Sequence, residues 1–169
     1  MPKSSAFANT VAAALVSLSL SLSCTRSETS LGDVDLAQAQ LDTMWLGLSA
    51  AMMAGDTSRL PAFYSDTALF AETGSPTLKG VIRIQGAAAS VFACCRYLES
   101  RMRPEITEFS GRRAFQFGTY RDVIQPTGQE PVTFYGRFSA ILDRGSANAW
   151  YVTRLMVIRD SSVPPLPPR

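Results

Sequence analysis

The chain has 169 residues, of which 46% are hydrophobic, and this length suits one folded domain with a single core. Its formal charge of +2 gives little attraction for phosphate, so nucleic acid is not expected as a partner. The sequence contains no histidine, which excludes histidine-based catalytic triads and the usual histidine-containing zinc and iron sites.

Residues 1–23 have the pattern of a secretory signal peptide. Lys3 precedes an apolar stretch at residues 11–22 that contains only Val, Ala, Leu and Ser. This stretch is shorter than the roughly 20 apolar residues that a membrane span needs. We therefore expect an exported protein, located in the periplasm or outside the cell or anchored to the membrane by a lipid.

Two outcomes are open for Cys24, the residue that follows this segment. Ser21 and Ser23 are the small residues that signal peptidase reads, so cleavage before Cys24 would release a soluble protein. Cys24 also resembles the lipid-accepting cysteine of bacterial lipoproteins, although Ser21 stands where those proteins usually have leucine. Residues 24–32 are rich in Ser, Thr and Glu, which predicts a flexible tether in either case.

Apolar residues recur with helical spacing over residues 33–54, which predicts a long α-helix. Its apolar stripe consists of Ala37, Leu41, Met44, Trp45, Leu48 and Met52. Asp33 is the expected N-cap and Gly55 the expected stop signal. A short helix at residues 59–64 and a strand at residues 67–72 are predicted to follow.

A third helix is predicted to begin after Gly80, to keep one apolar face as far as Leu98 and to end at Pro104. Cys94 and Cys95 would lie within it. Adjacent α-carbons are about 3.8 Å apart, closer than the roughly 4.4–6.8 Å of ordinary disulfides. A bridge would also interrupt the helix, so we expect no structural disulfide.

From residue 105 onward the apolar residues alternate with a period of two, which predicts β-strands. These strands are expected at residues 105–109, 112–125, 132–143 and 149–159. Short turns between them favour antiparallel hairpins, and Gly118 and Gly136 within the strands indicate bends. The expected fold class is α+β, with a bent antiparallel sheet packed on three N-terminal helices. A proline-rich tail at residues 161–169 is expected to be disordered.

Several landmarks occur along the chain in a recognisable order. They are Ala54-Gly55-Asp56 after the first helix, Phe63-Tyr64-Ser65-Asp66-Thr67-Ala68, Gly80, Tyr135-Gly136-Arg137-Phe138 and Trp150. Over residues 34–160 this order resembles the nuclear transport factor 2-like superfamily, most closely its SnoaL-like and ketosteroid-isomerase-like branches. The resemblance implies a cone-shaped domain at residues 33–160. It leaves activity open, because such folds serve isomerases, cyclases, dehydratases and binding modules.

The resemblance also implies an apolar pocket between the bent sheet and the helices. The candidate lining residues are Trp45, Tyr64, Phe70, Tyr120 and Arg137, and for each of them ordinary core packing or surface exposure is the alternative. Glu72 falls where the isomerases carry their catalytic base, and Arg137 could stabilise an oxyanion. Leu48 occupies the position where those enzymes have a donor tyrosine.

Other candidate acids are Asp66, Asp122 and Glu130, and Asp122 alternates onto the strand face of Tyr120. Three hypotheses for function follow. The domain could bind a small apolar or amphipathic molecule, or transfer protons on a polyketide- or steroid-like carbonyl compound with Glu72 as base. It could also be a dimerising association module. No cofactor and no metal site are predicted.

Overall fold

A computed structural model describes residues 31–160 of the chain. The elements are α1 (Leu31–Ala54), the 3-10 helix η1 (Thr57–Ala62), β1 (Tyr64–Glu72), β2 (Leu78–Lys79), α2 (Val81–Phe92), β3 (Cys95–Ser110), β4 (Arg113–Pro126), β5 (Val132–Arg144) and β6 (Trp150–Arg159). The predicted signal peptide, the lipid acceptor Cys24 and the proline-rich tail lie outside the described residues. Among the helices within residues 31–160, none combines the length and apolar character required to cross a membrane.

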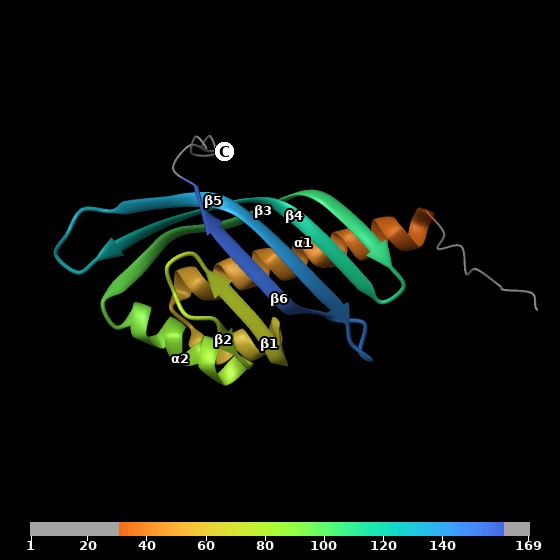
Figure 1. The fold of residues 1–169 in the computed structure, drawn as a ribbon, viewed down its shortest axis with the longest axis horizontal. Helices are drawn as coiled ribbons and strands as arrows, with labels where there is room; N and C mark the ends of the chain where they lie inside the picture. Colours follow the sequence, from red (N-terminus) through yellow and green to blue (C-terminus); the bar gives the residue numbers. More distant parts are fainter. Residues whose placement is uncertain (1–30, 161–169) are drawn as a thin grey trace, which may run out of the picture.

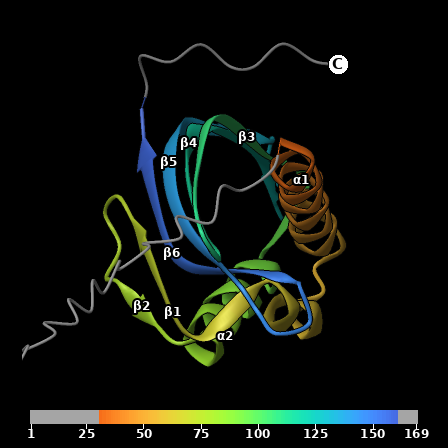
Figure 2. The same cartoon turned by 90° about the vertical axis from the view of Figure 1, so that its right-hand side faces the viewer.

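The strands form one six-stranded sheet in the order β2-β1-β6-β5-β4-β3. Each pair of neighbours in the described sheet is antiparallel except β1 and β6, which run parallel. Figure 1 shows the long strands β3 to β6 lying over α1, and Figure 2 shows the sheet curling around an interior that α1 and α2 border. The predicted α+β cone is therefore confirmed, with one parallel contact that hairpin connections do not predict.

The long helix α1 supplies one wall of the core. The predicted apolar stripe is buried at Ala37, Leu41, Met44, Trp45 and Leu48. The ring of Trp45 meets Phe138 of β5 edge-on, with 5.6 Å between ring centroids. Its indole N–H donates to the side-chain oxygen of Gln116 at 2.6 Å, which satisfies a polar group in the core.

The third helix is shorter than the sequence predicts. In the structure α2 ends at Phe92 rather than at Pro104, and the chain continues as strand β3 through Pro104 to Ser110. Pairing with β4 overrides the helical spacing, because Tyr97 and the residues after it find backbone partners on that strand. Pro104 is tolerated because β3 is an edge strand with a register shift at this point, so its missing N–H breaks little of the ladder.

The structure also corrects the expectation for the cysteines. Cys94 and Cys95 are joined as a vicinal disulfide, with α-carbons 3.7 Å apart. Because α2 ends at Phe92, the two residues lie at the turn into β3 and interrupt no helix. Neither reason for excluding the bridge holds, since the two residues are joined at this short α-carbon separation and lie beyond the end of the helix.

Candidate functional site

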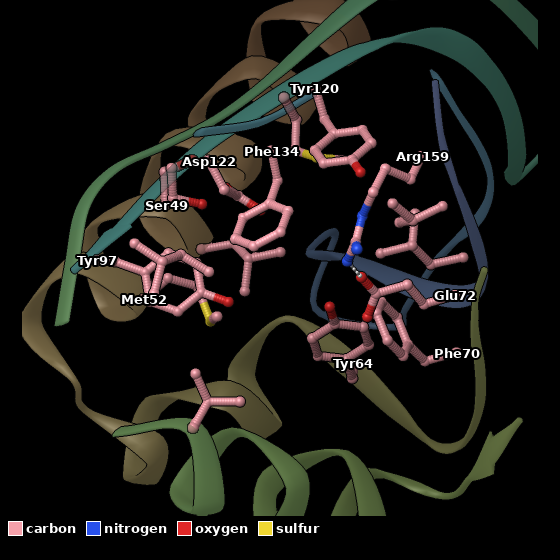
Figure 3. Close-up of a pocket in the computed structure, with 17 residues that line it drawn as sticks. Ser49, Met52, Tyr64, Phe70, Glu72, Tyr97, Tyr120, Asp122, Phe134 and Arg159 are labelled. Carbon is pink, nitrogen blue, oxygen red and sulfur yellow. Dashed lines mark hydrogen bonds and ion pairs between the residues drawn. The ribbon is translucent and has the colours of Figure 1, made fainter. Parts of the chain in front are cut away.

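A cavity of about 290 Å³ lies between the concave face of the sheet and the helices α1 and α2 (Figure 3). Its apolar wall consists of Leu48, Met52, Phe70, Val91, Met102, Ile124, Phe134, Leu155 and Val157. Its polar groups are Ser49, Tyr64, Glu72, Tyr97, Ser100, Tyr120, Asp122 and Arg159. An apolar chamber with a few convergent polar groups is the usual form of a small-molecule site.

Strand alternation explains how the polar groups reach the cavity. Tyr120 and Asp122 are two residues apart on β4, so both side chains point to the concave face. Phe70 and Glu72 have the same relation on β1. Asp122 also pairs with Ser100 across the β3–β4 ladder, which brings a hydroxyl beside the carboxylate.

Asp122 is the carboxylate most strongly affected by its surroundings. Burial raises the pKa of Asp122 to about 6, and the negative charge of Glu72 acts in the same direction. Hydrogen bonds from the Ser100 hydroxyl and the Arg101 backbone N–H oppose this rise in pKa. Within residues 31–160 no cation forms an ion pair with Asp122. A half-buried acid of this kind changes protonation close to neutral pH.

Three tyrosines line the same cavity as this acid (Figure 3). Burial raises the pKa values of Tyr64, Tyr97 and Tyr120, and Asp122 adds to the rise in each case. The three phenols therefore stay protonated at neutral pH and can donate hydrogen bonds. The hydroxyl of Tyr120 is buried without a hydrogen-bond partner of good geometry among the described residues, although nearby Arg159 partly opposes its pKa rise.

Glu72 and Arg159 lie beside each other in the cavity wall (Figure 3). The Nη2 atom of Arg159 donates to Oε1 of Glu72 at 3.4 Å. The same guanidinium lies 4.5 Å from the centre of the Phe134 ring, a cation–π arrangement. Glu72 therefore has a cationic partner, whereas Asp122 has none within the described chain.

Of the six residues predicted for the pocket and its catalytic pair, four line this cavity, namely Tyr64, Phe70, Glu72 and Tyr120. Trp45 does not, because its ring is buried against Phe138 and its N–H is bound to Gln116. Its predicted place in the pocket is therefore wrong.

Arg137 is also misplaced by the sequence argument. Its neighbours Gly136 and Phe138 face the interior, so strand alternation turns Arg137 to the outer face of the sheet. Its side chain is 68% exposed and its Nε atom lies 4.0 Å from a carboxylate oxygen of Asp160. Arg137 and Glu72 thus do not meet, and Arg159 is the arginine that the structure places beside Glu72.

Of the other candidate acids, Asp66 and Glu130 are exposed, whereas Asp122 lines the cavity. Sequence reasoning missed Tyr97 because it was assigned to a helix. Arg159 could have been found, since it lies two residues beyond Val157 on a predicted strand. No group of three or more Cys, Asp or Glu side chains within residues 31–160 is arranged to hold a metal ion.

Comparison with solved structures identifies the fold. A conserved protein from Planctomyces limnophilus is 14% identical, with a TM-score of 0.69, and the match covers 75% of this chain and 98% of that one. A ketosteroid isomerase-like protein from Erwinia carotovora is 15% identical, with a TM-score of 0.63 and coverage of 73% and 95%. An NTF2-like protein with a cystatin-like fold from Novosphingobium aromaticivorans is 13% identical, with a TM-score of 0.62 and coverage of 79% and 92%. Neither the protein-family models nor the curated proteins gave a match to the sequence.

Proposed function

We propose that this chain, which has the nuclear transport factor 2-like fold, binds a small amphipathic molecule in the cavity. The apolar wall supplies the hydrophobic contacts for the body of such a ligand. Asp122 and the three phenols supply the polar contacts that would orient it. The volume of about 290 Å³ is large enough for a compact bicyclic molecule.

The observation that carries this proposal is the environment of Asp122. Its carboxylate faces the cavity with two hydrogen-bond donors but no cation within residues 31–160. A ligand hydroxyl or N–H would give this acid a further hydrogen bond, and such bonds to charged groups are strong in a dry site. The preferred ligand therefore carries a hydrogen-bond donor on an apolar frame.

This proposal predicts discrimination between two arenes of similar shape. By calorimetry at pH 8, naphthol is expected to bind about tenfold or more tightly than methylnaphthalene, because only naphthol can donate to Asp122. Asp122→Asn should remove most of this preference, whereas Asp66→Asn, at an exposed position, should leave it unchanged. Equal binding of the two arenes, or no binding of either, would contradict the proposal.

A second function, proton transfer, is favoured by the same acid. The ionised carboxylate of an acid with a pKa near 6 can take a proton from the carbon next to a carbonyl, and a tyrosine hydroxyl can donate to the resulting enolate oxygen. Glu72 suits this role less well, because its carboxylate already accepts a hydrogen bond from the guanidinium of Arg159. The base proposed from the sequence is therefore replaced by Asp122.

This enzymatic alternative can be tested with the bicyclic ketone tetralone in deuterated water. NMR should show exchange of the hydrogens beside the carbonyl that depends on the protein. Asp122→Asn is expected to slow this exchange by about a hundredfold, and Glu72→Gln should slow it much less. If Glu72→Gln abolished exchange and Asp122→Asn did not, the original assignment to Glu72 would stand.

Export and lipid attachment are separate proposals that rest on residues 1–24 of the sequence. Intact mass spectrometry of the protein purified from its own host would test both. Export predicts loss of residues 1–23, and lipidation predicts an added acyl mass on Cys24. A mature chain that retains Lys3 would contradict export.

A dimer is a further proposal, supported by the outer face of the sheet. This face exposes Ile106, Phe115, Phe117, Met156 and Ile158, which are 40–55% accessible. Phe115, Phe117 and Met156 border a shallow groove of about 510 Å³. Apolar patches of this kind mark interaction surfaces, and a second copy of the same face would be self-complementary about a two-fold axis.

A further inference from the structure

The disulfide between Cys94 and Cys95 lies where α2 meets β3. Cys94 is exposed and Cys95 is half-buried, so small reagents can reach the pair. The proposed function makes no use of these cysteines. The two cysteines nevertheless lie close in sequence to residues of the cavity wall.

Backbone contacts fix this pair to three elements. The carbonyl oxygen of Cys94 accepts hydrogen bonds from the backbone N–H and the hydroxyl of Thr127, both at 2.9 Å. The N–H of Cys94 donates to the carbonyl oxygen of Val91 in α2 at 3.1 Å. Cys95 pairs with Pro126 at the end of β4. The disulfide thus lies at the junction of α2, β3 and the turn after β4.

Two residues beside this junction belong to the cavity wall. Val91 lies three residues before Cys94, and Tyr97 lies two residues after Cys95. Between them Phe92 meets the Tyr97 ring edge-on, with centroids 5.9 Å apart and planes at 82°. The disulfide thus lies in the short segment between two side chains that contact each other, Phe92 and Tyr97.

We propose that Cys94 and Cys95 form a reversible thiol–disulfide site whose closed ring holds Val91 and Tyr97 in the cavity wall. A disulfide between adjacent residues closes an eight-membered ring, which removes rotational freedom from the peptide unit that joins them. Opening the ring releases this restraint beside the cavity. The effect on ligand affinity rests on the proposed function of the cavity, whereas the redox site itself does not.

The surroundings of the pair favour exchange with a small anionic thiol. A shallow hollow of about 380 Å³ beside it is lined by Cys95, Arg96, Gln125 and Thr127, among others. The positive charge of Arg96 in this hollow attracts a carboxylate-bearing reagent. Glutathione has this chemistry and serves as the probe.

Ring closure then proceeds by ordinary thiol–disulfide exchange. One cysteine thiolate attacks oxidised glutathione, forming a mixed disulfide and releasing one glutathione thiolate. The second cysteine thiolate attacks the protein sulfur of this mixed disulfide and expels the second glutathione thiolate. The protein loses two electrons and two protons, and oxidised glutathione is reduced to two thiols.

The full chain is tested in glutathione buffers that range from reducing to oxidising. The tryptic peptide of residues 84–96 contains both cysteines and no other. In oxidising buffer it is expected to be two hydrogens lighter and to resist alkylation by iodoacetamide. Amide hydrogens of residues 91–97 should exchange more slowly, and naphthol should bind about three- to tenfold more tightly than in the reduced form.

Two variants serve as controls. The double variant Cys94→Ala/Cys95→Ala should show no response to the buffer and should resemble the reduced form. Cys24→Ser should respond as the unaltered chain does, because the third cysteine takes no part.

A peptide that stays fully alkylated in every buffer would overturn the redox site. A disulfide that forms without changing amide exchange or naphthol affinity would overturn its coupling to the cavity wall. If naphthol binds in neither state, the proposed cavity function fails, and slower exchange at residues 91–97 on oxidation still supports this site.

Discussion

Asp122 on β4 and Asp143 on β5 are carboxylates in opposite electrostatic environments. Burial raises the pKa of Asp122, while no cation within residues 31–160 forms an ion pair with it. Arg113 makes two hydrogen bonds to Asp143, at 2.7 and 3.0 Å, and these hold the pKa of that carboxyl below its usual range. The two acids should therefore change the stability of the fold with pH in opposite directions.

Asp122→Asn is predicted to stabilise the protein at high pH. A carboxyl with a raised folded-state pKa binds its proton more tightly in the folded state, so its ionisation destabilises the fold as pH rises from about 4 to about 6. Because asparagine stays neutral, the variant should match the unaltered protein below about pH 4. Above about pH 7 it should be more stable by about 1–3 kcal/mol in urea unfolding.

Asp143→Asn is the matched control with the opposite sign. Its stabilising ion pair is present above the unfolded-state pKa and is lost as pH falls through the lowered folded-state value. This variant should therefore be less stable than the unaltered protein at neutral pH and equal to it in strong acid. A stability loss at pH 8 in Asp122→Asn would contradict the assignment of Asp122 as an unfavourably buried charge.

Individual cavity residues were predictable where strand alternation was unambiguous. Phe70 and Glu72 share one face of a short predicted strand, and both line the cavity. Arg137 was assigned to the wrong face, because a period of two separates the faces of a strand without saying which is inside. The neighbouring glycine and phenylalanine decide this only once the pairing with β4 is known.

At the level of elements, the boundary between α2 and β3 was the main error. The spacing of apolar residues as far as Leu98 fits a helix, and only a non-local partner reveals the strand. That partner is β4, in which Gln125 pairs with Arg96. Local spacing predicted the other long strands well, because each of them follows its hairpin neighbour.

Gly118 is the residue that allows β3 and β4 to approach closely at the bend. A methyl group there would overlap the carbonyl oxygen of Arg103 and would lie 2.8 Å from the α-carbon of Pro104. We therefore expect Gly118→Ala to destabilise the protein by about 1–3 kcal/mol in urea unfolding.

Gly86 in α2 is the control for this substitution, since an added methyl group would meet nothing within 4 Å. Gly86→Ala should stabilise the protein by about 0.5–1 kcal/mol through helix propensity alone. If the two substitutions changed the free energy of unfolding equally, the close approach of β3 and β4 at Gly118 would not be what excludes a side chain there.

At the scale of the whole molecule, the dimer proposed through the outer face of the sheet can be tested by substitution. Met156→Glu would place a charge on the groove of the proposed dimer contact, where Met156 is 50% exposed in the single chain. Sedimentation velocity should show dimerisation at least about tenfold weaker. Ile82→Glu is the control, because Ile82 is 74% exposed on α2, away from the sheet. If the unaltered chain sediments as a monomer at every concentration, the proposed dimer is ruled out.

The overall architecture was largely predictable, because one long helix and four alternating strands allow few arrangements. The order of strands within the sheet was less predictable. Hairpins place β3 to β6 beside one another, but no local rule attaches β1 to the last strand. That attachment is a long-range contact, with Tyr64 opposite Val152 and Glu72 opposite Val157.

The parallel pair of β1 and β6 has a consequence for the order of assembly during synthesis. In the described sheet β1 has only the two-residue β2 and β6 as partners, and β6 ends at Arg159. The edge of β1 that faces β6 therefore stays unpaired until residues 150–159 have been synthesised. We therefore expect this long-range pairing to form late in folding and to be slow compared with the hairpins.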